Sequence, residues 1–347
     1  MKVRVFVFAA VMAVLCMTAE TVFAAQAPRL RVITTTCPLY DWTRQILGKR
    51  AAEVELIQLQ DNGVDLHSFQ PTVRDIARIA QCDLFVYVGG ESDKWVEAAL
   101  RSKRNTRRIA LNLVKELGDA AREEKHLEGM EEHDHHHDEK HDHHHDAKHD
   151  HHHDARHDHD HDEDEHEVDE HVWLSLRCAS RLCQSIMESL CKLDGEHAAE
   201  YRTNCKAYVA KLVQLDARYV KTVGKASRKN LLFADRFPFR YLAEDYGLTC
   251  FAAFSGCSAE TEASFKTIAF LAGKVDELKL PAVMVLENRQ HKIAETVVKT
   301  AKSKGVKIIA VDSLQSSTSR DAAKGKTYLV TMEKNLAAIR EALGISD

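Results

Sequence analysis

Histidine is the residue whose distribution in this sequence points most directly to chemistry. Of the 21 histidines in the 347-residue chain, 16 lie between residues 133 and 166, beside 13 acidic and 3 basic residues. The octad HDHHHDEK and two close copies of it follow one another from residue 133. Imidazoles mixed with carboxylates at this density suit zinc, copper, nickel and cobalt. We therefore predict loose cation binding by this histidine-rich segment, with these candidate ligands in its three octads: His133, His135, His136, His137, His141, His143, His144, His145, His149, His151, His152 and His153.

The composition of the histidine-rich segment argues against a packed structure. It has almost no apolar residue to bury, and an eight-residue repeat matches the period of neither a helix nor a strand. We expect a disordered insert over residues 126–168 in the absence of metal. The alternative interpretation is a solvated polar linker without metal contact.

Three residues outside this segment could form an ordered metal site. His67 lies in a loop after a predicted strand, His171 precedes a predicted helix, and Asp312 directly follows another predicted strand. Two imidazoles and a carboxylate are suitable ligands for a first-row transition metal. A single loop histidine is more often structural than a ligand, so this prediction depends on the convergence of all three.

Short apolar runs alternate with helical patterns in the remaining sequence, which indicates mostly parallel sheets covered by helices. The predicted strands cover residues 32–35, 53–59, 84–88, 230–234, 249–254, 282–286, 306–311 and 328–331. The predicted helices cover residues 39–47, 73–80, 172–193, 239–246, 261–278, 291–304 and 332–343. Thr72 and Asp75 have the spacing of a capping box for the second of these helices.

A separate long helix is predicted over residues 194–226, where apolar residues recur every three or four positions without proline. About 30 residues correspond to roughly 45 Å, enough to join two lobes as a rigid strut; an ordinary long surface helix is the alternative. The fold class is therefore α/β, with lobes over residues 25–193 and 227–347. Ligands of open α/β sheets bind beyond the carboxyl ends of the strands, so we expect the metal site in a cleft between the lobes.

The N-terminus predicts export. Lys2 and Arg4 precede an apolar run of about 11 residues, which is typical of a signal peptide, here residues 1–24. The run is too short to span a bilayer, which requires about 20 residues, and no later segment is a candidate span. We expect a mature chain in the periplasm or at the cell surface, without a lipid anchor at Cys16, because Leu15 is bulky for a lipoprotein cleavage site.

Charge and cysteine content limit the function further. The histidine-rich stretch carries a formal charge of −10, so the remaining chain carries +5 without a basic stripe, and nucleic acid is not an expected partner. Eight cysteines remain beyond Cys16. In an oxidising compartment an even number favours disulfides, whereas buried free thiols are the alternative interpretation.

Several motifs together resemble one known family. The segments NGVDLHSFQPTVRDIARIAQCDLFVYVGG, DEHVWLSL, FPFRYLAEDYGL and IIAVDSL, in this order around a His/Asp-rich insert, resemble the metal-binding proteins of ABC importers for zinc and manganese, most closely the zinc-uptake type. The resemblance covers about residue 30 to the C-terminus. It implies two α/β lobes joined by a rigid helix, a metal between them, and a membrane permease with an ATPase as partners of a monomer.

The resemblance also implies ligands. The first two family histidines fall on His67 and His171, and the terminal carboxylate falls on Asp312. The third family ligand falls on Arg236, whose guanidinium cannot coordinate a cation and must swing out or pair with an acid. Asp235 and Glu287 are candidate substitutes.

The sequence favours a zinc-capturing protein without covalent chemistry. Imidazole ligands favour zinc over manganese, which prefers oxygen-rich sites; an importer subunit for manganese or another divalent metal is the nearest alternative. No HExxH or GxSxG motif occurs, which leaves a metallohydrolase as a weaker alternative. A secreted metal-buffering or adhesion protein, in which the histidine-rich segment itself is the working part, is a third.

Overall fold

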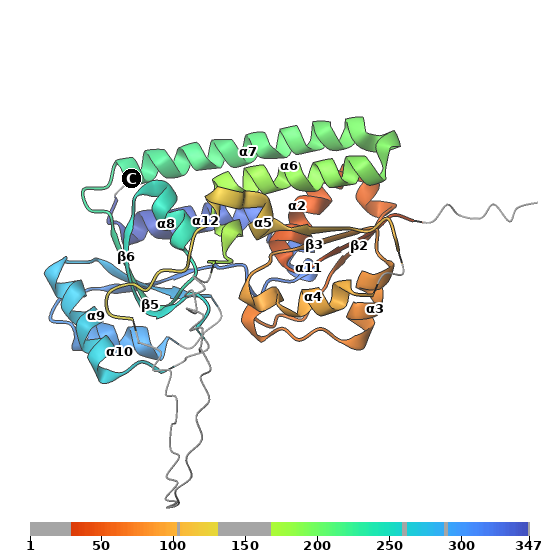
Figure 1. The fold of residues 1–347 in the computed structure, drawn as a ribbon. Helices are drawn as coiled ribbons and strands as arrows, with labels where there is room; N and C mark the ends of the chain where they lie inside the picture. The colour runs from red at the N-terminus through yellow and green to blue at the C-terminus, as the bar shows by residue number, and fades with distance from the viewer. Residues whose placement is uncertain (1–28, 103–104, 131–167, 259–261, 288–290, 346–347) are drawn as a thin grey trace, which may run out of the picture.

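The computed structural model describes residues 29–102, 105–130, 168–258, 262–287 and 291–345. The predicted signal peptide and the histidine-rich candidates lie outside these residues. The described chain forms two α/β lobes beneath a pair of long helices (Figure 1). The predicted fold class is therefore confirmed.

The first lobe is built on a parallel four-stranded sheet. In sheet order its strands are β2 (Glu55–Gln58), β1 (Arg31–Thr34), β3 (Leu84–Tyr87) and β4 (Ile109–Asn112). Val32 packs toward α2 (Cys37–Leu47) and α5 (Leu113–Leu117), whereas the next residue, Ile33, packs toward α3 (Val73–Gln81) and α4 (Trp95–Leu100). Both faces are covered because side chains alternate along a strand, and a parallel sheet needs helices on both sides.

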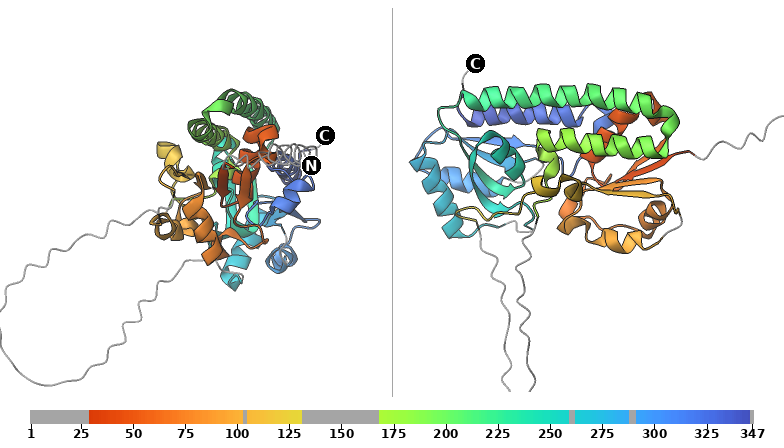
Figure 2. Two further views of the ribbon diagram at one scale, coloured as in Figure 1. Left: turned by 90° about the vertical axis from the view of Figure 1, so that its right-hand side faces the viewer. Right: turned by 45° about the horizontal axis from the view of Figure 1, so that its top comes forward.

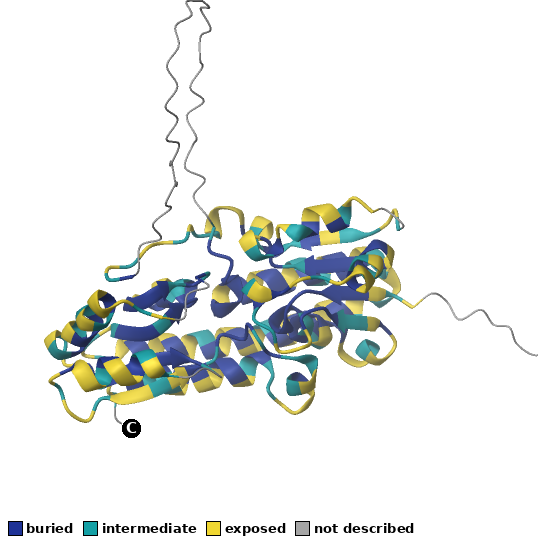
Figure 3. Ribbon diagram, turned by 90° about the horizontal axis from the view of Figure 1, so that it is seen from below, coloured by how far each residue is buried: buried dark blue, intermediate teal, exposed yellow. Residues whose placement is uncertain are grey.

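The second lobe repeats this plan. Its parallel strands, in sheet order, are β6 (Thr249–Ser255), β5 (Asn230–Phe237), β7 (Ala282–Leu286) and β8 (Lys307–Val311). Helices α9 (Phe265–Glu277) and α10 (Lys292–Thr300) cover one face, and α8 (Arg240–Tyr246) and α12 (Tyr328–Ala342) cover the other. Burial is concentrated in the strands and the inner helix faces (Figure 3).

Short helices complete the described chain. The 3-10 turns are η1 (Gly48–Ala52), η2 (Leu66–Ser68), η3 (Glu91–Asp93), η4 (Gly118–Ala120), η5 (Val172–Leu174) and η6 (Gly195–His197). A one-turn helix, α11 (Ser319–Ala323), precedes α12. Helix α3 begins with the predicted capping box, since the Thr72 side chain accepts from the Asp75 N–H and the Asp75 side chain accepts from the Thr72 N–H.

The long helix α7 (Ala198–Gly224) lies along both lobes beside α6 (Leu176–Leu193), as Figure 2 also shows. Its 27 residues correspond to about 40 Å. Near its start, Asn204 donates to the Ile46 carbonyl of the first lobe at 3.1 Å. Near its end, the Tyr219 hydroxyl donates to the Met332 carbonyl of the second lobe at 2.7 Å. The predicted bridging helix is thus confirmed, although it begins at Ala198 because η6 intervenes.

One hydrophobic core joins the two lobes. It contains Val86 from β3, Met284 from β7 and Leu215 from α7, all at most 2 % exposed. Helix α12 also reaches the first lobe, where the Asp41 carboxylate accepts from the Tyr328 N–H at 3.0 Å. Because the buried core is continuous, α6, α7 and α12 hold the lobes in one orientation.

Two sequence predictions differ from the structure. The predicted strand at residues 328–331 is wrong, because these residues form the first turn of α12, where the Thr327 side chain caps the Val330 N–H. Its aromatic and β-branched residues suit a strand by propensity, but the buried positions recur with a helical period. Strand β4 is absent from the predicted strands, because its four residues form too short an apolar run.

The eight cysteines beyond Cys16 are free thiols in the structure. Six of them are buried, which agrees with the alternative interpretation rather than with disulfides. Within the described residues, no helix combines the length and apolar character that a bilayer crossing requires.

Replacing Tyr219 by Phe tests the attachment of α7 to the second lobe. Loss of the buried hydrogen bond to the Met332 carbonyl should lower the free energy of unfolding by about 1 kcal/mol. Urea denaturation measures this change. Val213→Ala on the same helix is the control, because Val213 is 55 % exposed and its truncation should change little. Equal midpoints for wild type and Tyr219→Phe would contradict the assignment.

Candidate metal centre

The structure brings His67 and His171 together between the lobes. His67 lies in η2, where the Asp65 carboxylate accepts from the His67 N–H at 3.2 Å. His171 lies immediately before η5 and is fully buried. Their Nε2 atoms are 3.3 Å apart, although the residues are 104 positions apart in sequence. The two imidazoles therefore lie close together, as the predicted metal site requires of them.

Two adjacent carboxylates orient these imidazoles. The His171 Nδ1–H donates to Asp169 at 2.8 Å, and the His67 Nδ1–H donates to Glu170 at 3.0 Å. Ser92 supports the second pair, because its hydroxyl contacts both His67 Nδ1 and Glu170. With the proton fixed on Nδ1, each ring directs the Nε2 lone pair at the same point.

Burial and the neighbouring groups shift the pKa values of Glu170 and His171. Burial disfavours the ionised Glu170, but its hydrogen bond with His67 and the charge of His171 outweigh that effect, so the pKa of Glu170 is lowered. Burial likewise disfavours a charged His171, yet Asp169 and Glu170 together raise its pKa. Asp169 and Glu170 directly precede His171 in sequence, and the run Asp-Glu-His was the signal by which they could have been recognised.

Gln315 lies between the two histidines and was not predicted. Its amide nitrogen is 2.9 Å from His67 Nε2 and 2.8 Å from His171 Nε2. A primary amide carries two N–H donors, so one group satisfies both lone pairs. The Ser313 hydroxyl donates to the amide oxygen at 3.1 Å and fixes its direction. The Gln315 amide thus occupies the position at which a cation would be coordinated by both Nε2 atoms.

Cys257 is the third ligand-type residue at this point, and it too was not predicted. One ligand atom from each of His67, His171 and Cys257 lies within 4.8 Å of the others. Burial, followed by the charges of Glu170 and Glu124, raises the pKa of the Cys257 thiol. No spacing signal marks it in the sequence, because Cys257 is a single cysteine after β6.

Arg236, to which the resemblance assigns the position of the third family ligand, pairs with an acid as expected. Its guanidinium contacts the Asp65 carboxylate at 2.5 Å across the cleft and donates to the Ser258 carbonyl at 3.3 Å. Burial disfavours ionisation of Asp65, but Arg236 outweighs this and lowers its pKa. Asp65 also caps the His67 turn, so Arg236 links the loops of both lobes.

The three predicted acids lie nearby but contact other groups. Asp312 forms an ion pair with Lys326 at 2.7 Å, and Glu287 accepts from the Ser313 N–H at 2.8 Å. Asp235 accepts from the Leu286 N–H at 3.1 Å. Burial and the charge of Asp312 raise the pKa of Glu287 to about 7. The structure does not bring these carboxylates into the group formed by the two histidines.

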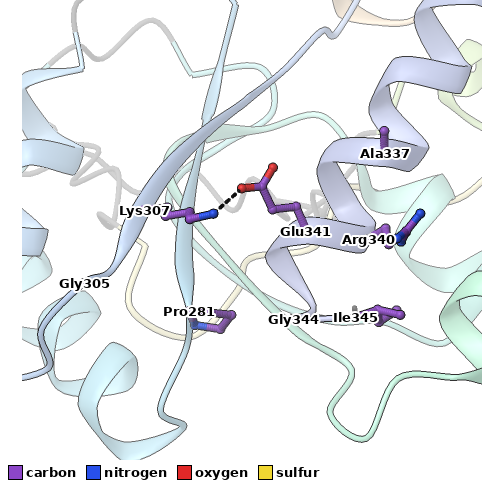
Figure 4. Close-up of a pocket in the computed structure, with 8 residues that line it drawn as sticks. All are labelled: Pro281, Gly305, Lys307, Ala337, Arg340, Glu341, Gly344 and Ile345. Atoms are coloured by element: carbon purple, nitrogen blue, oxygen red, sulfur yellow. Dashed lines mark hydrogen bonds and ion pairs between the residues drawn. The ribbon is translucent and has the colours of Figure 1, made fainter. Parts of the chain in front are cut away.

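A cleft of about 330 Å³ opens beside Gln315, between the Gly63–Asp65 loop of the first lobe and Glu287 of the second. A larger groove of about 550 Å³ lies at the other end of the second lobe, between β8 and α12 (Figure 4). Its acidic residue, Glu341, is paired with Lys307 at 2.8 Å. Of these two, the first cleft is the one that adjoins the converging imidazoles.

Two parallel-sheet lobes on a rigid helical back, with ligand-type residues meeting in the cleft, define a two-lobed binding protein. Comparison with known families makes the assignment specific. The chain belongs to the family described as zinc-uptake complex component A, periplasmic, whose model matches residues 32–342.

Named relatives and solved structures agree with this family assignment. The high-affinity zinc uptake system protein ZnuA of Bacillus subtilis is 31% identical over 319 residues, covering 92% of this chain and 89% of that protein. The zinc-binding protein AdcA of Streptococcus pyogenes is 30% identical over 90% of this chain, which spans only 56% of AdcA.

The metal-dependent lipoprotein YcdH of B. subtilis superposes with a TM-score of 0.68 at 27% identity, over 90% of this chain and 99% of YcdH. The Zn(II)-bound ZnuA-like domain of Streptococcus pneumoniae AdcA gives 0.66 at 27% identity, over 91% of this chain and 99% of the domain.

Replacing Asp93 by Asn tests the buried support of the η3 turn that carries Ser92. Burial, opposed by a hydrogen bond from the Gly89 N–H at 3.0 Å, raises the pKa of Asp93 from 3.8 to about 7. A raised pKa in the folded state stabilises the fold below pH 3.8, and this contribution is lost as pH rises toward about 7. Urea unfolding across this window should show the variant gaining stability relative to wild type, by on the order of 1.4 kcal/mol for each pH unit. Asp119→Asn, at an exposed position, controls for net charge, and parallel pH curves for Asp93→Asn and wild type would contradict the prediction.

Proposed function

We propose that this chain is an extracytoplasmic binding protein that captures zinc and delivers it to an ABC importer. The observation that carries the proposal is the 3.3 Å separation of the Nε2 atoms of His67 and His171. Zinc–nitrogen bonds of about 2.0–2.1 Å at a tetrahedral angle place two ligand nitrogens about 3.3 Å apart. The imidazoles therefore already have the separation that one zinc ion requires.

The carboxylates behind the histidines support the same function. Metal-binding histidines donate their second ring N–H to a carboxylate or carbonyl, which fixes the ring and increases its basicity. Asp169 and Glu170 occupy these positions for His171 and His67. An entering cation would take the two Nε2 lone pairs that Gln315 now satisfies, and the amide would turn away.

Asp312, Asp235 and Glu287 stay predicted ligands. Asp312 would have to exchange the Lys326 ammonium for the cation, whereas Asp235 and Glu287 would have to leave backbone amides. The proposal accordingly rests on His67 and His171. Imidazole ligands favour zinc over manganese, and the importer subunit for manganese remains the nearest alternative.

The histidine-rich segment is proposed to collect cations for this centre. Glu123 and Val168, which flank it on either side, form an antiparallel bridge, and the Asp169 N–H donates to the Arg122 carbonyl at 2.8 Å. His171 follows three residues after Val168. The chain that leaves the segment therefore enters the metal centre directly, which supports transfer of loosely held zinc over a short path.

The proposed partners are a membrane permease and its ATPase, served by a monomer that performs no covalent chemistry. The proposed location is the periplasm or the cell surface. Among the named relatives is a zinc-binding lipoprotein, AdcA of S. pneumoniae, so our expectation that Cys16 carries no lipid has no support from these names.

Replacing His67 or His171 by Ala tests the centre. Each variant should lose one of two converging nitrogens, and zinc affinity should fall by more than about 100-fold, beyond the usual loss for groups that only orient a ligand. Competition with a chromogenic chelator measures the affinity. His197→Ala is the control, since His197 pairs with Asp194 near the start of α7. Unchanged affinity in both site variants would overturn the assignment.

Deleting residues 133–166 tests whether the protein is a transport protein or a metal buffer. The 16 histidines of this segment would also be suitable for a buffer. The transport proposal expects one tight zinc site to persist, while the number of weakly bound ions falls. Zinc titration calorimetry of both chains gives the stoichiometry and affinity. Loss of nearly all bound zinc on deletion would favour the buffer.

A further inference from the structure

We propose that the Cys257 thiolate is the third protein ligand of the cation, which makes the centre a two-histidine, one-cysteine site. This inference rests on the proposed function, because it concerns the same bound ion. It supplies a third ligand, which is needed because the resemblance places Arg236 at the position of the third family ligand and a guanidinium cannot coordinate a cation.

The first support is distance. The ligand atoms of His67, His171 and Cys257 all lie within 4.8 Å of one another. Zinc–sulfur bonds of about 2.3 Å and zinc–nitrogen bonds of about 2.0 Å imply a sulfur–nitrogen separation of about 3.6 Å in a tetrahedral site. The sulfur therefore needs to approach by only on the order of 1 Å, the scale of a side-chain rotation.

The second support is the way in which the Cys257 loop is held against His171. A Cβ atom at Gly256 would lie 2.9 Å from His171 Cε1 and 3.1 Å from the Phe237 carbonyl oxygen. Only glycine therefore allows the loop after β6 to come this close to the imidazole. The Cys257 N–H donates to the Glu124 carboxylate at 3.4 Å, which fixes the loop on the side of the first lobe.

Arg236 holds the same loop at Ser258, the residue after Cys257. Its guanidinium donates to the Ser258 carbonyl at 3.3 Å while it pairs with Asp65. Asp65 in turn caps the turn that carries His67. Arg236 is thus a positioning residue, and it aligns the cysteine loop of one lobe with the histidine loop of the other.

The third support is the competition among candidate ligands. The Cys257 sulfur makes a long contact of 3.8 Å with Glu170 Oε1. Asp312, by contrast, is held by the Lys326 ammonium at 2.7 Å and by the Leu314 N–H at 2.9 Å. Turning the Cys257 sulfur to a cation therefore breaks only one long contact, whereas turning the Asp312 carboxylate breaks an ion pair and a hydrogen bond. When the ion binds, the S–H bond is replaced by a sulfur–metal bond and the proton passes to solvent.

A thiolate beside two imidazoles determines the class of cation. Such a donor set suits zinc and softer ions such as cadmium, whereas manganese prefers oxygen ligands. The inference thus deepens the proposed preference for zinc by adding a donor that manganese does not favour.

Cobalt(II) and cadmium(II) are the probes for this ligand, used with the full mature chain kept reduced. One equivalent of either ion should produce a thiolate-to-metal charge-transfer band in the ultraviolet, and cobalt should add the intense visible bands of tetrahedral coordination. Cys257→Ser should abolish the charge-transfer band and weaken zinc binding by at least about 10-fold, since a direct ligand contributes no less than the groups that orient it. Cys191→Ser is the matched control, because Cys191 is similarly half-buried and lies on α6.

A second measurement does not depend on how the variant folds. Zinc should slow alkylation of Cys257 by iodoacetamide in the wild-type chain by at least about 10-fold, as followed by peptide mass spectrometry, because a coordinated sulfur is not free to attack. Tight zinc binding by His67 and His171 with no charge-transfer band and no protection of Cys257 would overturn the thiolate ligand and leave the proposed function standing. A wild-type chain that binds no zinc would overturn both.

Discussion

The buried pairing of two imidazoles with two carboxylates is the interaction on which the rest of the centre depends. Glu170 and His171 are fully buried, and an isolated charge there would be strongly destabilising. Asp169 and Glu170 compensate by accepting the Nδ1 protons of His171 and His67. The same two hydrogen bonds fix the tautomer of each ring and direct both Nε2 lone pairs at one point. The bonds that compensate the buried carboxylates therefore also orient the imidazoles for a cation.

The helical back of the molecule holds this pairing against the second lobe. The four paired groups all belong to the first lobe, whereas Gln315 and Cys257 come from the second, so a change in the orientation of the lobes would separate these two residues from the imidazoles. One core runs from β3 through α7 to β7, and Tyr219 and Asn204 attach α7 to opposite lobes. Core packing at interior density resists such a change because it allows few alternative arrangements. The binding loops can therefore differ in sequence without loss of the frame.

The sequence predicted the helices and strands of the two lobes better than it predicted the contacts within the cleft. Alternating strands and helices, the long α7 and the capping box of Thr72 are expressed in local patterns, and they were found. The strand prediction for residues 328–331 was wrong because these few residues have high strand propensity, whereas their burial follows a helical period. His67 and His171 were predicted from residue type and family resemblance. Gln315 and Cys257 could not be, because their roles depend on loop geometry rather than on spacing.

The bridge between Glu123 and Val168 limits the entropic cost of the chain between them. Because the two residues pair directly, the 44 residues between them close a loop, of which residues 124–130 still lie on the fold, with Met130 buried in the core. The entropy of closing such a loop rises only by about 0.6 kcal/mol for each doubling of its length. Lengthening or shortening the histidine-rich segment by one octad therefore changes the cost of loop closure by less than about 0.6 kcal/mol, so the length of this segment has little effect on the stability of the fold that holds His67 and His171.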